Sequence, residues 1–149
     1  MKHNLISEIR VAYSKKKGDD VHITSSKMAF ESILPHYPKD TIALQEQFLI
    51  MYLNRVNKVI GVYHAFTGGI TSTVVDIRII LAVALKSMAC GMIISHNHPS
   101  GVIKPSLADN ELTNKIKEAS RLMDIELLDH IIVSPDRKTY YSFKDEGEL

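Results

Sequence analysis

Two histidines one residue apart, His96 and His98, are the residues whose types and spacing best indicate chemistry in this chain. They follow an apolar run over residues 92–94, which is typical of a buried strand. Because side chains at i and i+2 of an extended chain point to the same face, the two imidazoles should converge on one point. Imidazole is a common zinc ligand, and catalytic zinc sites combine three protein ligands with a water molecule. The pair therefore predicts part of a metal site.

A third ligand is available in Asp109 if the loop over residues 99–105 folds back toward the histidines. Ser106 and Asp109 also have a structural interpretation, because Ser-x-x-Asp before an amphipathic helix resembles a capping box. For Ser106 the roles are compatible, since its oxygen can accept from the backbone while its O–H remains free to donate. For Asp109 we expect them to compete, because a carboxylate folded onto its own helix should not also reach a metal. The histidine pair favours ligation.

The order His-x-His-Pro, six residues, then Ser-x-x-Asp resembles the JAMM (MPN+) metalloprotease signature at every defining position. The wider context, from Ser-His-Asn-His-Pro-Ser-Gly to Leu-Leu-Asp-His-Ile-Ile-Val-Ser, resembles the bacterial RadC-like branch of that superfamily over residues 9–143. The resemblance implies an α/β (α+β) fold: a cytidine deaminase-like JAB/MPN core, with a curved mixed β-sheet flanked by helices. It also implies Zn²⁺ as the cofactor, with His96, His98 and Asp109 as its ligands.

The same resemblance assigns the remaining roles. The family's general base lies far upstream of the histidines, and the matching residue is Glu46, which local sequence alone does not distinguish from other acidic residues. Ser106 matches the residue that stabilises the oxyanion of a tetrahedral intermediate. Asp129 and His130 match an Asp-His pair of the family, and we interpret them as structural or as hydrogen-bonding partners of the ligands.

Composition narrows the function classes. The 149 residues are 45% hydrophobic and carry a net charge of +1, which suits one globular domain and argues against nonspecific nucleic-acid binding. A metal-dependent nuclease is disfavoured, since phosphodiester cleavage commonly uses paired metals and cationic clamps. The only cysteine, Cys90, excludes a disulfide within the chain, and we expect it to be a small buried residue. With neither a signal-peptide pattern nor a long apolar run, we expect a cytoplasmic protein that does not enter the membrane.

Three regions are expected along the chain. Residues 1–40 form a lead-in with an edge strand near 9–13 and a short helix capped by Ser25 or Ser26. Residues 41–143 form the RadC-like JAB/MPN metal-binding domain, and the acidic tail over 144–149 frays. The lead-in is too short for the helix-hairpin-helix region of larger relatives, so we predict a short form without it.

Hydrophobic periodicity predicts the elements that position the site. Strands are expected over 48–53, 59–66, 70–75, 92–95, 127–133 and 140–143. One helix is expected over 76–89 with Asp76 as its N-cap, and another from near Ser106, with Leu112, Ile116, Ala119 and Met123 on its apolar face. This order places the histidines at the end of a buried strand and Asp109 at the start of a helix.

The function predicted from sequence is a zinc-dependent hydrolase, a metallopeptidase or isopeptidase that acts through activated water. The alternative is a non-catalytic RadC-family module with a DNA-repair or mobile-element-associated binding role. The complete ligand set and the matching Glu46 favour retained chemistry, because a pure scaffold has no need of an open metal position. The sequence leaves open the physiological substrate, DNA as a partner, and the oligomeric state.

Overall fold

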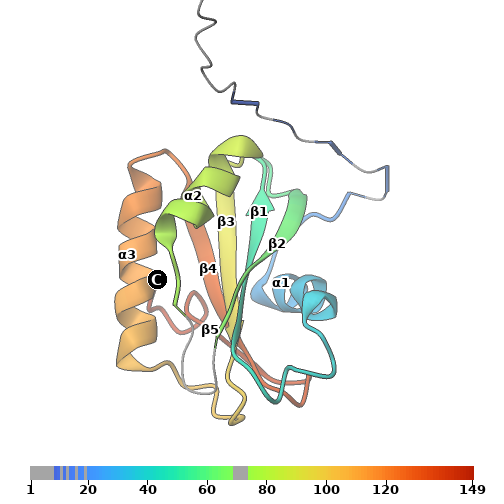
Figure 1. Ribbon diagram of the computed structural model, residues 1–149, viewed down its shortest axis with the longest axis vertical. Coiled ribbons are helices and arrows are strands. Elements are labelled where there is room, and N and C mark those ends of the chain that lie inside the picture. The colour runs from blue at the N-terminus through green and yellow to red at the C-terminus, as the bar shows by residue number, and fades with distance from the viewer. Residues whose placement is uncertain (1–8, 11, 13, 16, 19, 69–73) are drawn as a thin grey trace, which may run out of the picture.

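Five strands form one mixed sheet with helices on both faces in the computed structural model, which describes residues 9, 10, 12, 14, 15, 17, 18, 20–68 and 74–149 (Figure 1). The mixed α/β fold is as predicted and is consistent with a JAB/MPN core. The helices are α1 (Ser26–Ile33), α2 (Ile77–Lys86) and α3 (Leu107–Arg121), with a short 3-10 turn η1 (Leu34–His36) after α1. The strands are β1 (Gln47–Leu53), β2 (Val59–Thr67), β3 (Gly91–Asn97), β4 (Glu126–Val133) and β5 (Tyr140–Ser142).

The sheet order is β2-β1-β3-β4-β5. Strand β3 pairs with β1 antiparallel and with β4 parallel, so β3 and β4 finish at the same end of the sheet at which β1 begins. Three segments distant in sequence therefore meet at this end of the sheet: the residues before β1, the residues after β3 and the end of β4.

Two hydrophobic layers sandwich the sheet, and β1 contributes to both. All seven residues of β1 are buried, which confirms the prediction of a central strand covered on both faces. Leu49 and Met51 pack with residues of α1, whereas Phe48, Ile50 and Tyr52 pack with residues of α2 and α3. Figure 1 shows α1 on one side of the sheet and α3 on the other. The face covered by α3 is the one that carries the candidate site.

The helix starts follow local capping chemistry. The side chains of Ser25, Asp76 and Ser106 each accept a hydrogen bond from the backbone of the helix they precede, as the sequence predicted. The strands predicted over 9–13 and 70–75 lie partly outside the described residues, and the described residues of both ranges belong to no strand.

Two expectations differ from the structure. Residues 143–149 form a hydrogen-bonded turn, in which Glu148 N donates to Phe143 O at 2.8 Å and Leu149 packs against the core, so the predicted fraying of the tail does not match. Cys90, in the short connection between α2 and β3, is exposed, so the expectation of a small buried residue is wrong. Among the described residues, no helix is both long and apolar enough to cross a membrane.

Candidate metal centre

Strand β3 delivers both histidines to one end of the sheet. The ring of His96 stacks on Phe48 of β1, with centroids 6.1 Å apart. His98 lies just beyond the strand, and its backbone N–H still donates to Val133 O of β4 at 3.2 Å. The chain therefore stays extended through His98, and the two imidazoles converge as predicted, with their Nε2 atoms 2.8 Å apart.

The side chain of Asn97, between the two histidines, lies on the opposite face of the sheet and binds backbone groups there. Its side-chain amide donates to the carbonyl oxygens of Ile42 at 2.7 Å and Gln45 at 2.8 Å, and its Oδ1 accepts from Gln47 N at 2.7 Å. These three bonds replace water for backbone groups of the segment that enters β1. Asn97 thus fixes the segment that contains the predicted general base.

Glu46 is the residue directly before β1, and it is partly exposed. Phe48 of β1 pairs with His96 of β3, so the same antiparallel register continued by two residues places Glu46 opposite His98. The alternation of side chains puts it on the face of Phe48 and His96. Its charge is also one of the smaller factors that raise the pKa of His98. The structure thus brings Glu46 to the histidine end of the sheet.

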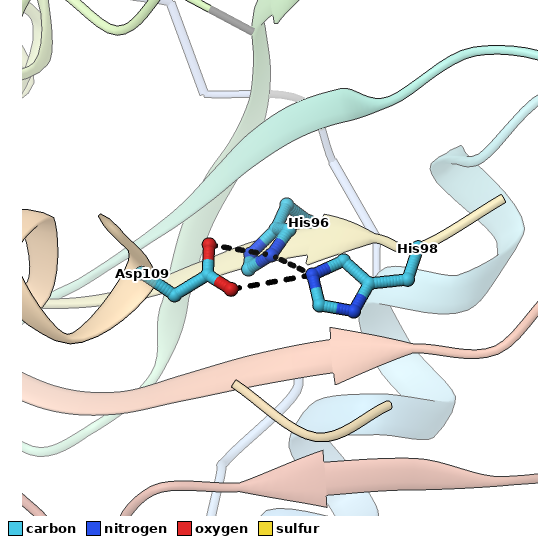
Figure 2. A group of neighbouring side chains, drawn as sticks. All are labelled: His96, His98 and Asp109. Carbon is cyan, nitrogen blue, oxygen red and sulfur yellow. Dashed lines mark hydrogen bonds and ion pairs between the residues drawn. The ribbon is translucent and has the colours of Figure 1, made fainter. Parts of the chain in front are cut away.

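The loop after His98 reverses the chain, so that α3 begins beside the end of β3 (Figure 2). Ser106 Oγ accepts from Asp109 N at 3.1 Å, and Asp109 Oδ2 accepts from Ser106 N at 2.7 Å, which completes a capping box. The same carboxylate lies 3.2 Å from His96 Nε2 through Oδ1 and 3.3 Å from His98 Nε2 through Oδ2. The expected competition between capping and reaching the site is therefore wrong, because the Asp109 carboxylate accepts the capping bond and lies beside both histidines at the same time.

Ser106 differs from expectation in the use of its hydroxyl group. Its O–H donates to Asp109 Oδ2 at 2.7 Å, while its oxygen accepts from the backbone of the same residue. The hydroxyl proton is therefore engaged within the capping box, although Ser106 itself is exposed. To donate to an oxyanion, Ser106 would have to exchange its bond to the carboxylate for one to the substrate.

The three side chains fit a metal ion by donor type and by spacing. Their nearest ligand atoms, two imidazole nitrogens and one carboxylate oxygen, lie within 4.8 Å of one another (Figure 2). In a tetrahedral zinc site with bonds near 2.0–2.1 Å, ligand atoms are separated by about 3.3 Å. The two histidine–carboxylate distances, 3.2 Å to Oδ1 and 3.3 Å to Oδ2, are close to this value but end on different oxygens, and the 2.8 Å between the imidazoles is shorter by about half an ångström. Two neutral imidazoles and one carboxylate are a typical donor set for Zn²⁺.

The electrostatics of the group favour a cation between its members. Burial of Asp109 opposes its ionisation, but the adjoining side chains of His96 and His98 outweigh burial and hold the pKa of this carboxyl well below its usual range. In turn, the hydrogen bond to Asp109 raises the pKa of His98. Without a metal, a proton on His98 Nε2 can bridge the short gap to His96 Nε2. Protons and a metal ion therefore compete for the same position.

Each histidine has a partner on its Nδ1 atom, which directs Nε2 toward the site. His98 Nδ1 lies 2.6 Å from the carbonyl oxygen of Val102, and His96 Nδ1 lies 2.8 Å from Nε2 of the buried His130. Burial and then the proximity of His96 lower the pKa of His130 well below its usual value. The carboxylate of Asp129 accepts from the backbone N–H of His130 and from Ser142 Oγ. Of the Asp-His pair matched to the family, Asp129 thus has a structural role, and His130 is the hydrogen-bonding partner of the candidate ligand His96.

Thr113 of α3 is a member of this site that the sequence analysis missed. Its Oγ1 lies 2.6 Å from Asp109 O and 2.6 Å from His130 Nδ1, and the residue is 1% exposed. A signal was present in the sequence, because Thr113 is a polar residue at a position adjoining the predicted apolar face of the helix, one turn after Asp109.

Fold and site together define the class of protein: a JAB/MPN-type domain with a His-His-Asp group at the end of its central strands. The sequence profile described as the RadC-like JAB domain matches residues 23–148. The chain therefore belongs to the RadC-like JAB domain family, which confirms the resemblance seen in the sequence and places it in the JAB/MPN superfamily.

Relatives in three bacteria share this region, each named "UPF0758 protein". The chain is 43% identical to the relative from Flavobacterium johnsoniae over 84% of its own length and 52% of the relative. It is 38% identical to that from Porphyromonas gingivalis over 85% of the chain and 54% of the relative. It is 44% identical to that from Streptococcus gordonii over 70% of the chain and 46% of the relative. The chain thus spans about half the length of the curated relatives it matches.

Proposed function

We propose that this chain is a zinc-dependent hydrolase of amide or isopeptide bonds, of the JAMM type. The observation that supports this most directly is the convergence of His96, His98 and Asp109 within 4.8 Å, from a strand and a helix that no local sequence constraint brings together. Three ligands are the number that catalytic zinc sites use, with the fourth position left for water. The register position of Glu46 opposite His98 adds a carboxylate at the same end of the sheet.

In this mechanism the chain's own residues hold the metal and move the protons. His96 and His98 would hold the metal through Nε2 and Asp109 through its carboxylate, and the ion would supply polarisation of a water molecule and of the scissile carbonyl group. The carboxylate of Glu46 accepts a proton from the attacking water and then delivers it to the leaving nitrogen, as general base and then general acid. Ser106 stabilises the developing oxyanion after its O–H turns from Asp109 toward the substrate.

The test combines metal analysis with Glu46→Gln. The probes are fluorescence-quenched peptides, one set cleaved at a backbone amide and a second set at a lysine ε-amide. We expect zinc to bind stoichiometrically to both the parent and the variant, and the variant to lose about 10²–10⁴-fold in cleavage rate. Glu111→Gln is the matched control, since it makes the same charge change at an exposed position in the first turns of α3. If the parent binds zinc but cleaves neither set, or if Glu46→Gln cleaves at the parental rate, the hydrolase proposal fails.

The alternative proposal is a binding module that keeps the metal site without using it. One observation favours it: the Ser106 hydroxyl is already donated to Asp109 and is not aimed outward. In that case a cellular phenotype of the gene would survive Glu46→Gln unchanged but would be lost in a variant that cannot hold the metal, such as His98→Ala. DNA as the partner would appear as salt-dependent binding of a labelled duplex.

A further inference from the structure

A chain of hydrogen bonds links two of the candidate ligands through the protein interior. His96 Nδ1 lies 2.8 Å from His130 Nε2, His130 Nδ1 lies 2.6 Å from Thr113 Oγ1, and Thr113 Oγ1 lies 2.6 Å from Asp109 O. His96 and the two linking side chains, His130 of β4 and Thr113 of α3, are between 0% and 1% exposed. Because solvent cannot exchange partners with them, each proton in the chain has a defined position.

The direction of every bond follows from the groups at the Asp109 end. A carbonyl oxygen only accepts, so the single proton of Thr113 is donated to Asp109 O. Toward His130, Thr113 must therefore accept, which puts a proton on His130 Nδ1. A neutral imidazole carries only one N–H, so His130 Nε2 accepts from His96 Nδ1–H. The chain thus leaves the lone pair of His96 on Nε2, the atom that faces Asp109 and His98.

The environment of the His130 ring keeps it in place and uncharged. Phe143 stacks on it at 4.6 Å with an interplanar angle of 11°. The ring is 0% exposed, and its Nδ1–H is already donated to Thr113, so burial disfavours a second proton and leaves Nε2 to accept from His96.

The second histidine, His98, is oriented by a local contact. Its Nδ1–H donates to the carbonyl oxygen of Val102 at 2.6 Å, four residues away in the loop. His96 differs, because its tautomer depends on side chains from two other elements. Through His130 and Thr113, His96 is connected to the body of α3 beyond its first turn.

We propose that His130 and Thr113 are positioning residues that set the tautomer and ring orientation of His96 and hold it in register with the first turn of α3. This inference rests on the proposed metal site for its functional meaning, but the tautomer it predicts is a property of the metal-free chain. Hydrogen-bonding partners of ligand histidines typically change metal affinity by 10–100-fold. The coupling also means that β3 and α3 present their ligands as one unit.

The experiment uses Thr113→Val, which keeps the branched shape but removes the hydroxyl group, and Thr113→Ser, which restores it. Ser120→Ala is the matched control, because Ser120 is a fully buried polar residue two turns along α3 whose hydroxyl donates to Lys117 O of the same helix. Zinc affinity is measured by competition with a chromogenic chelator. The tautomer of His96 is read from long-range ¹⁵N–¹H spectra of metal-free, ¹⁵N-histidine-labelled protein at about pH 8, above the usual histidine range.

We expect Thr113→Val to weaken zinc binding by about 10–100-fold, with Thr113→Ser and Ser120→Ala within about threefold of the parent. In the metal-free parent and in Thr113→Ser, His96 should show the Nδ1–H form, and in Thr113→Val a mixture of both forms. Parental zinc affinity in Thr113→Val overturns the proposal, as does a His96 that is protonated on Nε2 in the metal-free parent. The tautomer measurement on the parent needs no variant, so it tests the proposal even if Thr113→Val fails to fold. If the parent binds no zinc, the proposed function fails, while the tautomer measurement still tests this inference separately.

Discussion

The carboxylate of Asp109 joins the start of α3 to the candidate metal position, and two substitutions separate these roles. Both capping bonds from Ser106, from its N–H and from its O–H, reach the same oxygen, Oδ2. An asparagine amide oxygen can accept both bonds but carries no charge, so Asp109→Asn should preserve the helix start and weaken the metal site. Asp109→Ala removes the capping acceptor together with the ligand.

The expected magnitudes follow from the bonds that each substitution removes. Zinc contributes about 10–16 kcal/mol to four-ligand structural sites, so an equal share for one ligand is roughly 3 kcal/mol, or about a hundredfold in Kd. Both Asp109 variants should therefore bind zinc at least about a hundredfold more weakly. Loss of a helix cap costs about 1 kcal/mol, so the metal-free Asp109→Ala should also unfold about 1 kcal/mol more easily than Asp109→Asn.

The assay pairs chelator competition for zinc with urea unfolding of the chelator-treated protein. Asp124→Asn is the matched control, since it makes the same change at an exposed position just beyond the other end of α3. Zinc affinity of Asp109→Asn equal to that of the parent would remove this residue from the ligand set. Equal unfolding free energies for the two Asp109 variants would refute the capping role derived from the structure.

Three further results are expected. In metal-free protein, the lowered pKa of Asp109 stabilises the fold above the unfolded pKa of 3.8, and the raised pKa of His98 stabilises it below the unfolded pKa of 6.5. Urea unfolding should therefore show a larger stability advantage of the parent over Asp109→Asn near pH 5 than near pH 8. An advantage that does not change with pH would contradict this. Zinc affinity should fall as pH drops through the histidine range, with about two protons taken up per zinc released at the limit, and calorimetry showing constant affinity between about pH 5 and 7 would exclude histidine ligands. Asp129→Ala leaves donors from His130, Ser142 and Lys144 without their acceptor, so urea unfolding should show a loss of about 3–5 kcal/mol, whereas a loss below about 1 kcal/mol would mean that water replaces the carboxylate.

The local pattern of apolar and capping residues predicted the strands and helices that flank the site, because burial of a strand on both faces and capping of a helix each depend on only a few neighbouring residues. The apolar run of β1, the strand into the histidines and the caps Asp76 and Ser106 all appear where the sequence places them. The role of Glu46 came from resemblance alone, since nothing within its own segment separates it from a solvated carboxylate. Its position opposite His98 depends on the pairing of β1 with β3, strands about forty residues apart in the chain.

By itself, the sequence indicated which side chains could form the His-His-Asp group, because i,i+2 alternation aligns His96 with His98 and a capping box orders the first turn of the next helix. The tertiary structure decided that Asp109 could cap its helix and reach both histidines at once, since that depends on where α3 starts relative to the end of β3. It also decided which nitrogen of His96 is free. That tautomer depends on a buried threonine and a buried histidine from two other elements, and only packing of the helix against the sheet removes the water that would otherwise compete for their protons.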